Sequence, residues 1–314
     1  MTDSSSLSSL IQDFLEHLEI ERRVSQFTIR NYAHYLHRFS DWFTHQAVGD
    51  ITKLDIKLVK KYRLYLSRLT DHHGKTLAFV TQSYHVIALR SFLKWLIRQD
   101  YQVISPEKID LPKGESRSLK FLNREQVERL LSAPSISNLS GLRDKAILEV
   151  LFSTGLRVSE LINLNRDQID LKRREFGVIG KGRRARIVFL SGRAADWLHR
   201  YLATRQDDWL PLFVNHYRKK VDPHTKGLEM RLTARSVQRL VGHYCQKVKL
   251  PVQITPHGLR HTFATDLLSS GAGLREVQEL LGHKNIATTQ IYTHVTDRQL
   301  KQIYQRAHSG NKGE

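Results

Sequence analysis

The sequence predicts a mainly α-helical protein of two domains with one small β-sheet. Apolar residues recur at steps of three and four along most of the chain, which is the spacing of amphipathic helices. One pair of β-rich runs, residues 176–179 and 186–190, interrupts this pattern. The 314 residues, 40% of them hydrophobic, exceed what one core usually organises, so two compact units are expected.

The first third of the chain predicts a bundle of helices. A helical stripe begins behind a serine-rich segment that can supply an N-cap, and three more stripes follow. The stripes cover residues 7–18, 32–43, 56–66 and 86–97. Four amphipathic helices form a small all-α bundle. Its basic side chains can contact phosphates, although solvation is the simpler interpretation of any one of them.

A polar segment separates this bundle from the rest of the chain. Residues 101–118 hold Pro106, Pro112 and Gly114 and show no apolar period, which is typical of a linker. We therefore expect a helical domain over residues 1–104, a linker over 105–118 and a second domain over 119–314.

The second domain is expected to combine helices with one β-hairpin. Asn123 and Gln126 form a capping-box pattern, and a buried helix ends at Thr154 and Gly155. Residues 180–184 form a glycine-containing turn between the two β-rich runs. Further helices are predicted over residues 194–202, 237–244, 256–268 and 274–281.

The charge of the chain indicates a polyanionic partner. Fifty Lys and Arg residues against 31 Asp and Glu leave a net charge of +19 and a pI near 10.1. Such an excess favours nucleic acid through the release of counterions from phosphates. The alternative is that the charge only keeps the chain soluble.

The composition also excludes several classes of protein. The single cysteine, Cys245, excludes an internal disulfide and a Cys-rich zinc site. The N-terminus lacks the pattern of a signal peptide, and no window approaches the roughly 18 apolar residues of a membrane-spanning helix. We therefore expect a cytoplasmic protein that does not bind a membrane.

A short motif offers two cations to one anion. Thr255 and Pro256 predict a helix start, with His257 in the first turn and Arg260 three residues later on the same face. Both side chains can meet an anion near the positive end of the helix. The motif is weak alone, because a structural histidine beside a surface arginine is common.

Four further residues of the second domain accompany this pair. They are Arg157 in TGLRVSEL, Lys181 in GKGRRAR, His283 in LLGHKNIATT and Tyr292 in QIYTHV. With these motifs, residues 122–295 resemble the tyrosine recombinase, or phage integrase, family, and within it the Xer-type site-specific recombinases. The N-terminal bundle more loosely resembles the SAM-like core-binding domain of that family.

The resemblance implies an enzyme that cleaves and rejoins DNA. The catalytic residues that it implies are Arg157, Lys181, His257, Arg260, His283 and Tyr292. Tyr292 is then the nucleophile that forms a 3′-phosphotyrosine intermediate, His257 accepts its proton, and Lys181 protonates the leaving 5′ oxygen. The resemblance also implies a specific double-stranded site, a C-shaped clamp on DNA, and a tetramer that acts through a Holliday junction.

Elementary chemistry agrees with these roles. Attack on a phosphodiester builds negative charge on its non-bridging oxygens, and Arg157 and Arg260 can each donate paired N–H groups to them. Asp, Glu and His do not cluster at metal-ligand spacing, so neither a metal nor another cofactor is expected. Glu160, three residues after Arg157, can orient that arginine by a salt bridge, or it is an ordinary surface residue.

Other residues near these motifs have weaker interpretations. His261 and His294 fill no required role, and Tyr244 and Tyr304 lie on helical stripes that predict core positions. No function is indicated for residues 219–226.

The end of the chain predicts a last amphipathic helix after residue 297. In the family such a tail docks on a neighbouring protomer, but it could instead cap its own domain. Whether the tetramer contains one recombinase or two, and whether an activating protein takes part, stays open.

Resolution of chromosome or plasmid dimers is the favoured role, because no arm-binding domain precedes the bundle. An integrase of a phage, transposon or integron remains an alternative. A type IB topoisomerase, which shares the chemistry without strand exchange, and a non-catalytic DNA-binding protein are less favoured.

Overall fold

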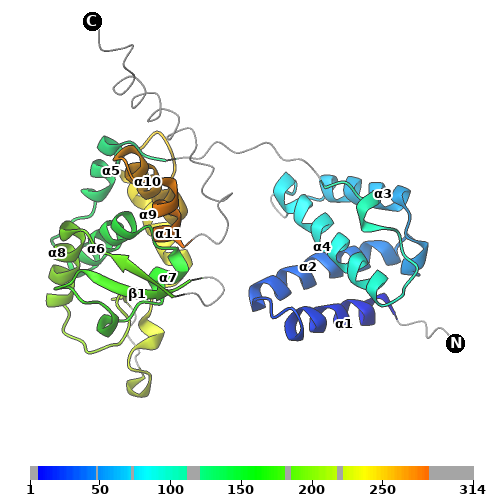
Figure 1. Ribbon diagram of the computed structural model, residues 1–314, viewed down its shortest axis with the longest axis horizontal. Helices are drawn as coiled ribbons and strands as arrows, with labels where there is room; N and C mark the ends of the chain where they lie inside the picture. Colours follow the sequence, from blue (N-terminus) through cyan, green and yellow to red (C-terminus); the bar gives the residue numbers. More distant parts are fainter. Residues whose placement is uncertain are drawn as a thin grey trace, which may run out of the picture. The chain divides into compact units, whose positions relative to one another are not determined.

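Helices form nearly all of the regular structure in the two units of the chain (Figure 1). The computed structural model describes residues 6–46, 49–71, 74–111, 121–180, 185–217 and 222–282. Contacts divide the chain into Met1–Arg117 and Ser118–Glu314. The described residues contain eleven α-helices and one two-stranded sheet, which confirms the predicted fold class.

The first unit is a four-helix bundle with two short 3-10 turns. Its elements are α1 (Leu7–Ile20), α2 (Gln26–Thr44), η1 (Ile51–Lys53), α3 (Ile56–Arg68), α4 (Phe79–Arg98) and η2 (Pro106–Lys108). Ser6, Ser25 and Asp55 cap three of the helices by accepting backbone N–H groups. The four apolar stripes meet in one core, as the periodicity predicts.

The start of the predicted linker packs on this bundle instead. Ile109 is fully buried in the core of the first unit, and Pro106 is buried in η2. Tyr101 and Ile104 also pack against the core. Periodicity cannot detect this contact, because one apolar residue in a polar segment forms no repeat.

The second unit surrounds a buried helix. Its elements are α5 (Arg124–Leu131), α6 (Leu139–Thr154), α7 (Val158–Ile162), η3 (Arg166–Gln168), β1 (Glu175–Ile179), β2 (Ala185–Phe189), α8 (Gly192–Ala203), η4 (Pro223–Thr225), η5 (Leu228–Met230), α9 (Ala234–Lys247), α10 (Pro256–Ser269) and α11 (Leu274–Leu281). α6 packs against α8 and α10, and residues 146–151 of α6 are all buried. The predicted capping box of Asn123 and Gln126 is present. The antiparallel pairing of β1 and β2 confirms the hairpin.

Tyrosine and cysteine side chains complete this core. Tyr244 is buried as predicted, and its hydroxyl donates to Asp144 Oδ2 at 3.0 Å. Cys245 is fully buried.

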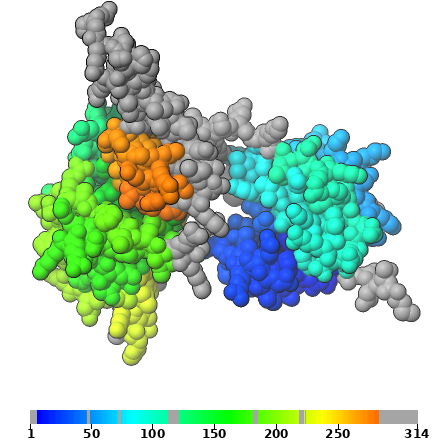
Figure 2. Space-filling view, in the orientation of Figure 1, coloured from blue at the N-terminus to red at the C-terminus, as the bar shows by residue number. Residues whose placement is uncertain are grey.

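In the space-filling view the last described residues, in orange, lie on the surface of the second unit (Figure 2). None of the described helices has the length and apolarity of a membrane span.

The segment without a predicted function is partly described. Asp222 caps His224 at the start of η4, and the N–H of Leu210 donates to the carbonyl of Lys226. Gly227 follows with a φ of +72°, and a Cβ there would lie 2.3 Å from Trp209. Residues 222–227 therefore pack on a neighbouring loop of their own unit.

Candidate active site

The turn between α6 and α7 positions Arg157. Gly155 ends α6 with a φ of +59°, and a Cβ at this position would lie 2.4 Å from the ring of Phe263 in α10. Glycine therefore allows both the left-handed backbone and the close approach of α10. Two residues later Arg157 is the N-cap of α7.

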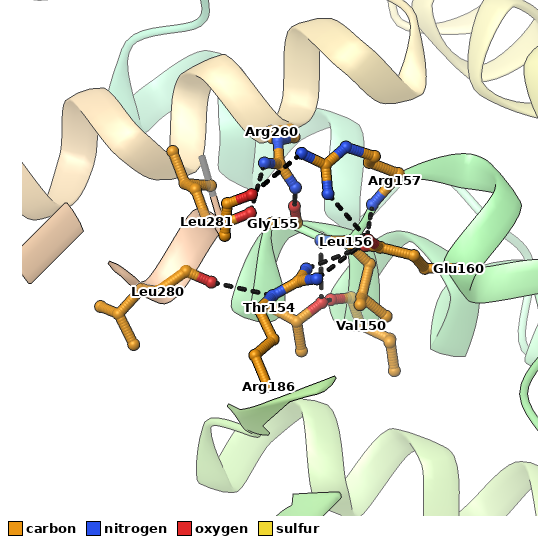
Figure 3. A network of polar contacts seen from close by, with 11 residues as sticks. Val150, Thr154, Gly155, Leu156, Arg157, Glu160, Arg186, Arg260, Leu280 and Leu281 are labelled. Atoms are coloured by element: carbon orange, nitrogen blue, oxygen red, sulfur yellow. Dashed lines mark hydrogen bonds and ion pairs between the residues drawn. The ribbon is translucent and has the colours of Figure 1, made fainter. Parts of the chain in front are cut away.

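Glu160 holds Arg157 at this position. Its carboxylate is buried and accepts a hydrogen bond from Arg157 Nη1 at 2.8 Å and from the Arg157 backbone N–H at 2.9 Å (Figure 3). Burial alone would raise the pKa of Glu160, but hydrogen bonds from Arg186 and Arg157 lower it to about 2. The predicted salt bridge is confirmed, and Glu160 is not a surface residue.

A second arginine, which the sequence did not indicate, meets the same carboxylate. Arg186 in β2 donates Nη1 and Nη2 to Glu160 at 2.9 and 2.8 Å (Figure 3). Its register partner in β1 is Val178, which is buried. Arg186 lies two residues before the buried Val188, so the two side chains share one face of the strand. This spacing is the one signal that could have placed Arg186 on the inner face of the hairpin.

Arg260, on α10, joins Arg157, Arg186 and Glu160, and these four residues form the arginine cluster (Figure 3). Thr255 caps this helix by accepting the N–H of Gly258, which confirms the predicted helix start. Arg260 is 2% exposed and donates Nη1 to the carbonyl of Gly155 at 2.8 Å and Nη2 to that of Leu281 at 2.6 Å. The fold therefore brings Arg260 to the turn that precedes Arg157.

The C-terminal end of α11 brings the three arginines together. Its carbonyls accept one hydrogen bond each, from Arg186 Nε to Leu280 at 3.2 Å, from Arg260 Nη2 to Leu281 and from Arg157 Nη2 to Gly282 at 3.4 Å. The last carbonyls of a helix lack donors within the helix and carry the negative end of its dipole. This end therefore offsets the repulsion among three guanidinium groups.

The described residues include half of the predicted catalytic set. Arg157, His257 and Arg260 are described, whereas Lys181, His283, Tyr292, His294 and Tyr304 lie outside the described residues. Gly180 and Gly282, which directly precede Lys181 and His283 in the sequence, lie beside the arginines and Glu160. Gly282 accepts from Arg157, and a Cβ on Gly180 would lie 3.3 Å from Glu160 Oε1 and 3.4 Å from Arg186 Nη1.

His257 pairs with a residue for which no role is predicted. Its Nε2 lies 2.9 Å from Nε2 of His261, and the two rings meet edge to face at 80°. Partial desolvation and the charges of Arg260 and Arg157 lower the pKa of His257. Burial, His257 and Arg260 lower the pKa of His261 to about 4. Both imidazoles are therefore neutral at pH 7.

The site as a whole can bind an anion. Glu160 pairs with Arg157 and Arg186, and Arg260 adds a third guanidinium group, so positive charge dominates. The side chain of Arg157 is 30% exposed. Guanidinium groups bind phosphate oxygens through paired N–H donors. Within the part of the chain that the structure describes, no three His, Cys, Asp or Glu side chains gather as metal ligands do.

Comparisons with known proteins agree with this geometry. Residues 120–299 match the model of the phage integrase family, and residues 11–100 match the phage integrase N-terminal SAM-like domain. The chain belongs to the phage integrase family. The prediction made from its six motif residues is thereby confirmed at the level of the family.

Relatives of similar length share this membership. The tyrosine recombinase XerD of Lacticaseibacillus casei is 35% identical over 306 residues, which cover 96% of this chain and 99% of the relative. XerC of Bacillus subtilis (strain 168) is 35% identical over 308 residues, with 96% and 97% covered. The chain is therefore a tyrosine-type DNA recombinase, an enzyme that cleaves and rejoins DNA.

A solved structure supports the fold. XerH recombinase bound to a palindromic difH substrate, in a post-cleavage complex, aligns with a TM-score of 0.70 at 22% identity, covering 96% of this chain and 84% of XerH.

Proposed function

We propose that this chain is a Xer-type recombinase that acts in the cytoplasm and resolves chromosome or plasmid dimers at a specific DNA site. The observation that carries the proposal is the convergence of Arg157 and Arg260 beside His257, on the carbonyls of Gly155 and of the end of α11. Relatives named as Xer recombinases match nearly the whole chain, which supports the Xer-type role.

The arginines and His283 bind the scissile phosphate. As the phosphorus is attacked, charge grows on the non-bridging oxygens, and donors already fixed in place stabilise it without reorganisation. Glu160 fixes Arg157, and the carbonyl of Gly155 fixes Arg260. This preorganisation serves the purpose that a metal ion serves in other nucleases.

The phenol of Tyr292 then replaces the 5′ oxygen on phosphorus. Its proton passes to His257 as the new O–P bond forms, and Lys181 donates a proton to the 5′ oxygen as the old bond breaks. A neutral His257 can accept this proton, and its lowered pKa keeps it neutral at pH 7. The phosphotyrosine conserves the bond energy, so the strand is rejoined without ATP.

Strand exchange needs several copies of the chain. In the proposed assembly four protomers bind two DNA sites, and pairs of them cleave in turn through a Holliday junction. The two domains of each protomer clamp the duplex, and the C-terminal tail docks on a neighbour. The partner is a second copy or a second recombinase.

The test of this function is covalent attachment of the protein to a nicked suicide DNA substrate. Tyr292→Phe should abolish the adduct and leave duplex binding nearly unchanged, because only the nucleophilic oxygen is removed. The wild-type chain should form the adduct in excess EDTA and without ATP. Normal adduct yield from the variant, or a strict need for a divalent ion in cleavage, would contradict the assignment.

The same adducts identify the biological role. DNA attached to the protein in its own cells can be recovered and its ends sequenced. A single site on the chromosome or a plasmid supports dimer resolution, whereas the ends of a mobile element would show that the chain is an integrase.

A further inference from the structure

The pair of histidines on α10 has a defined proton count. His257 and His261 lie one helical turn apart on the same face, and their Nε2 atoms are 2.9 Å apart. A hydrogen bond between two imidazoles needs one donor and one acceptor. Each neutral ring carries one N–H, so one of the two Nε2 atoms holds the proton and the other presents its lone pair.

The surroundings keep this pair neutral. His261 is 8% exposed, whereas His257 is exposed at the start of α10. Among the described residues, the guanidinium of Arg260, from α10 itself, lowers the pKa of both rings, and that of Arg157, from the N-cap of α7, lowers the pKa of His257. Both disfavour positive charge on the pair. Two imidazolium rings with their Nε2 atoms 2.9 Å apart would also repel each other, so the pair can accept one proton but not two.

We propose that His261 is a positioning residue that accepts the Nε2–H of His257 and thereby leaves the Nδ1 lone pair of His257 for the proton of Tyr292. The inference rests on the proposed function. In the step, the phenol proton moves to Nδ1 while the tyrosine O–P bond forms and the P–O5′ bond breaks. Lys181 supplies the proton of the 5′ hydroxyl. His257 becomes an imidazolium, and its Nε2–H still donates to His261.

A neutral acceptor suits this site better than a carboxylate. Many enzymes orient a catalytic base with a third group, often an aspartate. Glu160 already pairs with Arg157, and a second carboxylate beside Arg157 and Arg260 would compete with the phosphate for their N–H donors. His261 orients the ring and stabilises the imidazolium, yet it adds no negative charge. Rejoining uses the same pair in reverse, because His257 then returns its proton to the tyrosine.

The experiment compares His261→Phe with His261→Gln in single-turnover cleavage of the nicked substrate. Phenylalanine fills the site without an acceptor, whereas glutamine offers an amide oxygen. We expect the phenylalanine variant to cleave about 10-fold more slowly, which is part of the roughly 10²- to 10⁴-fold that a general base contributes. The acid limb of its pH–rate profile should move to lower pH, because the imidazolium of His257 loses its acceptor. Glutamine should restore most of the rate.

Controls separate this inference from the function on which it rests. DNA affinity should be unchanged in both variants, and His199→Phe, an exposed histidine of α8, should cleave as the wild type does. A phenylalanine variant with the wild-type rate and pH profile, or a glutamine variant as slow as phenylalanine, would overturn the role of His261. Adducts from Tyr292→Phe would instead overturn the proposed function.

A third variant covers the case in which phenylalanine prevents folding. His261→Ala leaves space for a small acceptor, so added imidazole should raise its cleavage rate. A slow rate that imidazole does not change would count against the positioning role.

Discussion

Glu160 shows how one buried carboxylate organises an anion site. It holds two arginines from different elements, α7 and β2, and its pKa of about 2 keeps it ionised. Because the pKa is lowered from 4.5, the stabilisation from these ion pairs is complete above pH 4.5 and is lost as the pH falls toward 2. The pairs therefore persist throughout the neutral range.

Glu160→Gln is expected to weaken both stability and catalysis. Removal of the charge leaves Arg157 and Arg186 close together without a counter-ion, and breaking a buried pair costs about 3 kcal/mol or more. Urea unfolding measures the loss, and cleavage of the nicked substrate should fall with it. Glu128→Gln, which breaks an exposed pair with Arg193, should cost less than about 1 kcal/mol. Equal costs for the two variants would show that Glu160 does not organise the site.

The sequence predicted individual residues of the site unequally. Arg157, His257 and Arg260 were predicted because each belongs to a motif. The choice between two interpretations of Glu160 depended on its burial, which three-residue spacing does not reveal. Arg186 was missed because it lies among several basic residues of one hairpin. His261 was assigned no role because the sequence does not show its contact with His257.

At the scale of elements, the α6–α7 turn couples the end of a core helix to the anion site. Gly155 has both a positive φ and no room for a side chain, and its carbonyl binds Arg260. A substitution there should therefore move Arg157 and Arg260 together.

Gly155→Ala tests this coupling against a matched glycine. The left-handed backbone alone costs roughly 1–2 kcal/mol in a residue with a Cβ, and contact with Phe263 adds to it. Thermal unfolding should show the loss, and the cleavage rate should fall as well. Gly242→Ala in α9 should be neutral or stabilising by about 0.5–1 kcal/mol, because nothing lies within 4 Å of its Cβ. A folded, fully active Gly155→Ala variant would show that the turn does not position the arginines.

Elements were easier to predict than the contacts between them. Apolar periodicity found the helices, and alternation with a glycine turn found the hairpin. The three arginines at the end of α11 could not be foreseen, because hydrogen-bonded partners there lie as many as 125 residues apart in sequence. The burial of Ile109 was not predicted for a similar reason, since it depends on a tertiary contact alone.

At the scale of the whole molecule, two separate cores predict two separable activities. A fragment of residues 1–111 keeps Ile109 and so the complete first core, and a fragment of residues 119–314 keeps the second. The second fragment should bind DNA more weakly than the intact chain, because it makes only part of the phosphate contacts. It should still cleave a nicked site slowly at high concentration, whereas the first fragment should only bind.

Adduct formation by each purified fragment measures this division. Circular dichroism establishes that each fragment is folded, and the intact chain on the same site serves as the control. Cleavage by the first fragment, or none by a folded and DNA-bound second fragment, would show that the active site is misplaced.

Cys245 makes local opening of the second unit measurable within the intact chain. It is the only thiol, it lies in the core of the second unit, and burial raises its pKa. An alkylating reagent can therefore react only when that core opens, and opening of the helical bundle gives no signal. The labelling rate of the unmodified protein thus reports how often the core of the second unit opens. A bound duplex that stabilises this unit would slow the reaction.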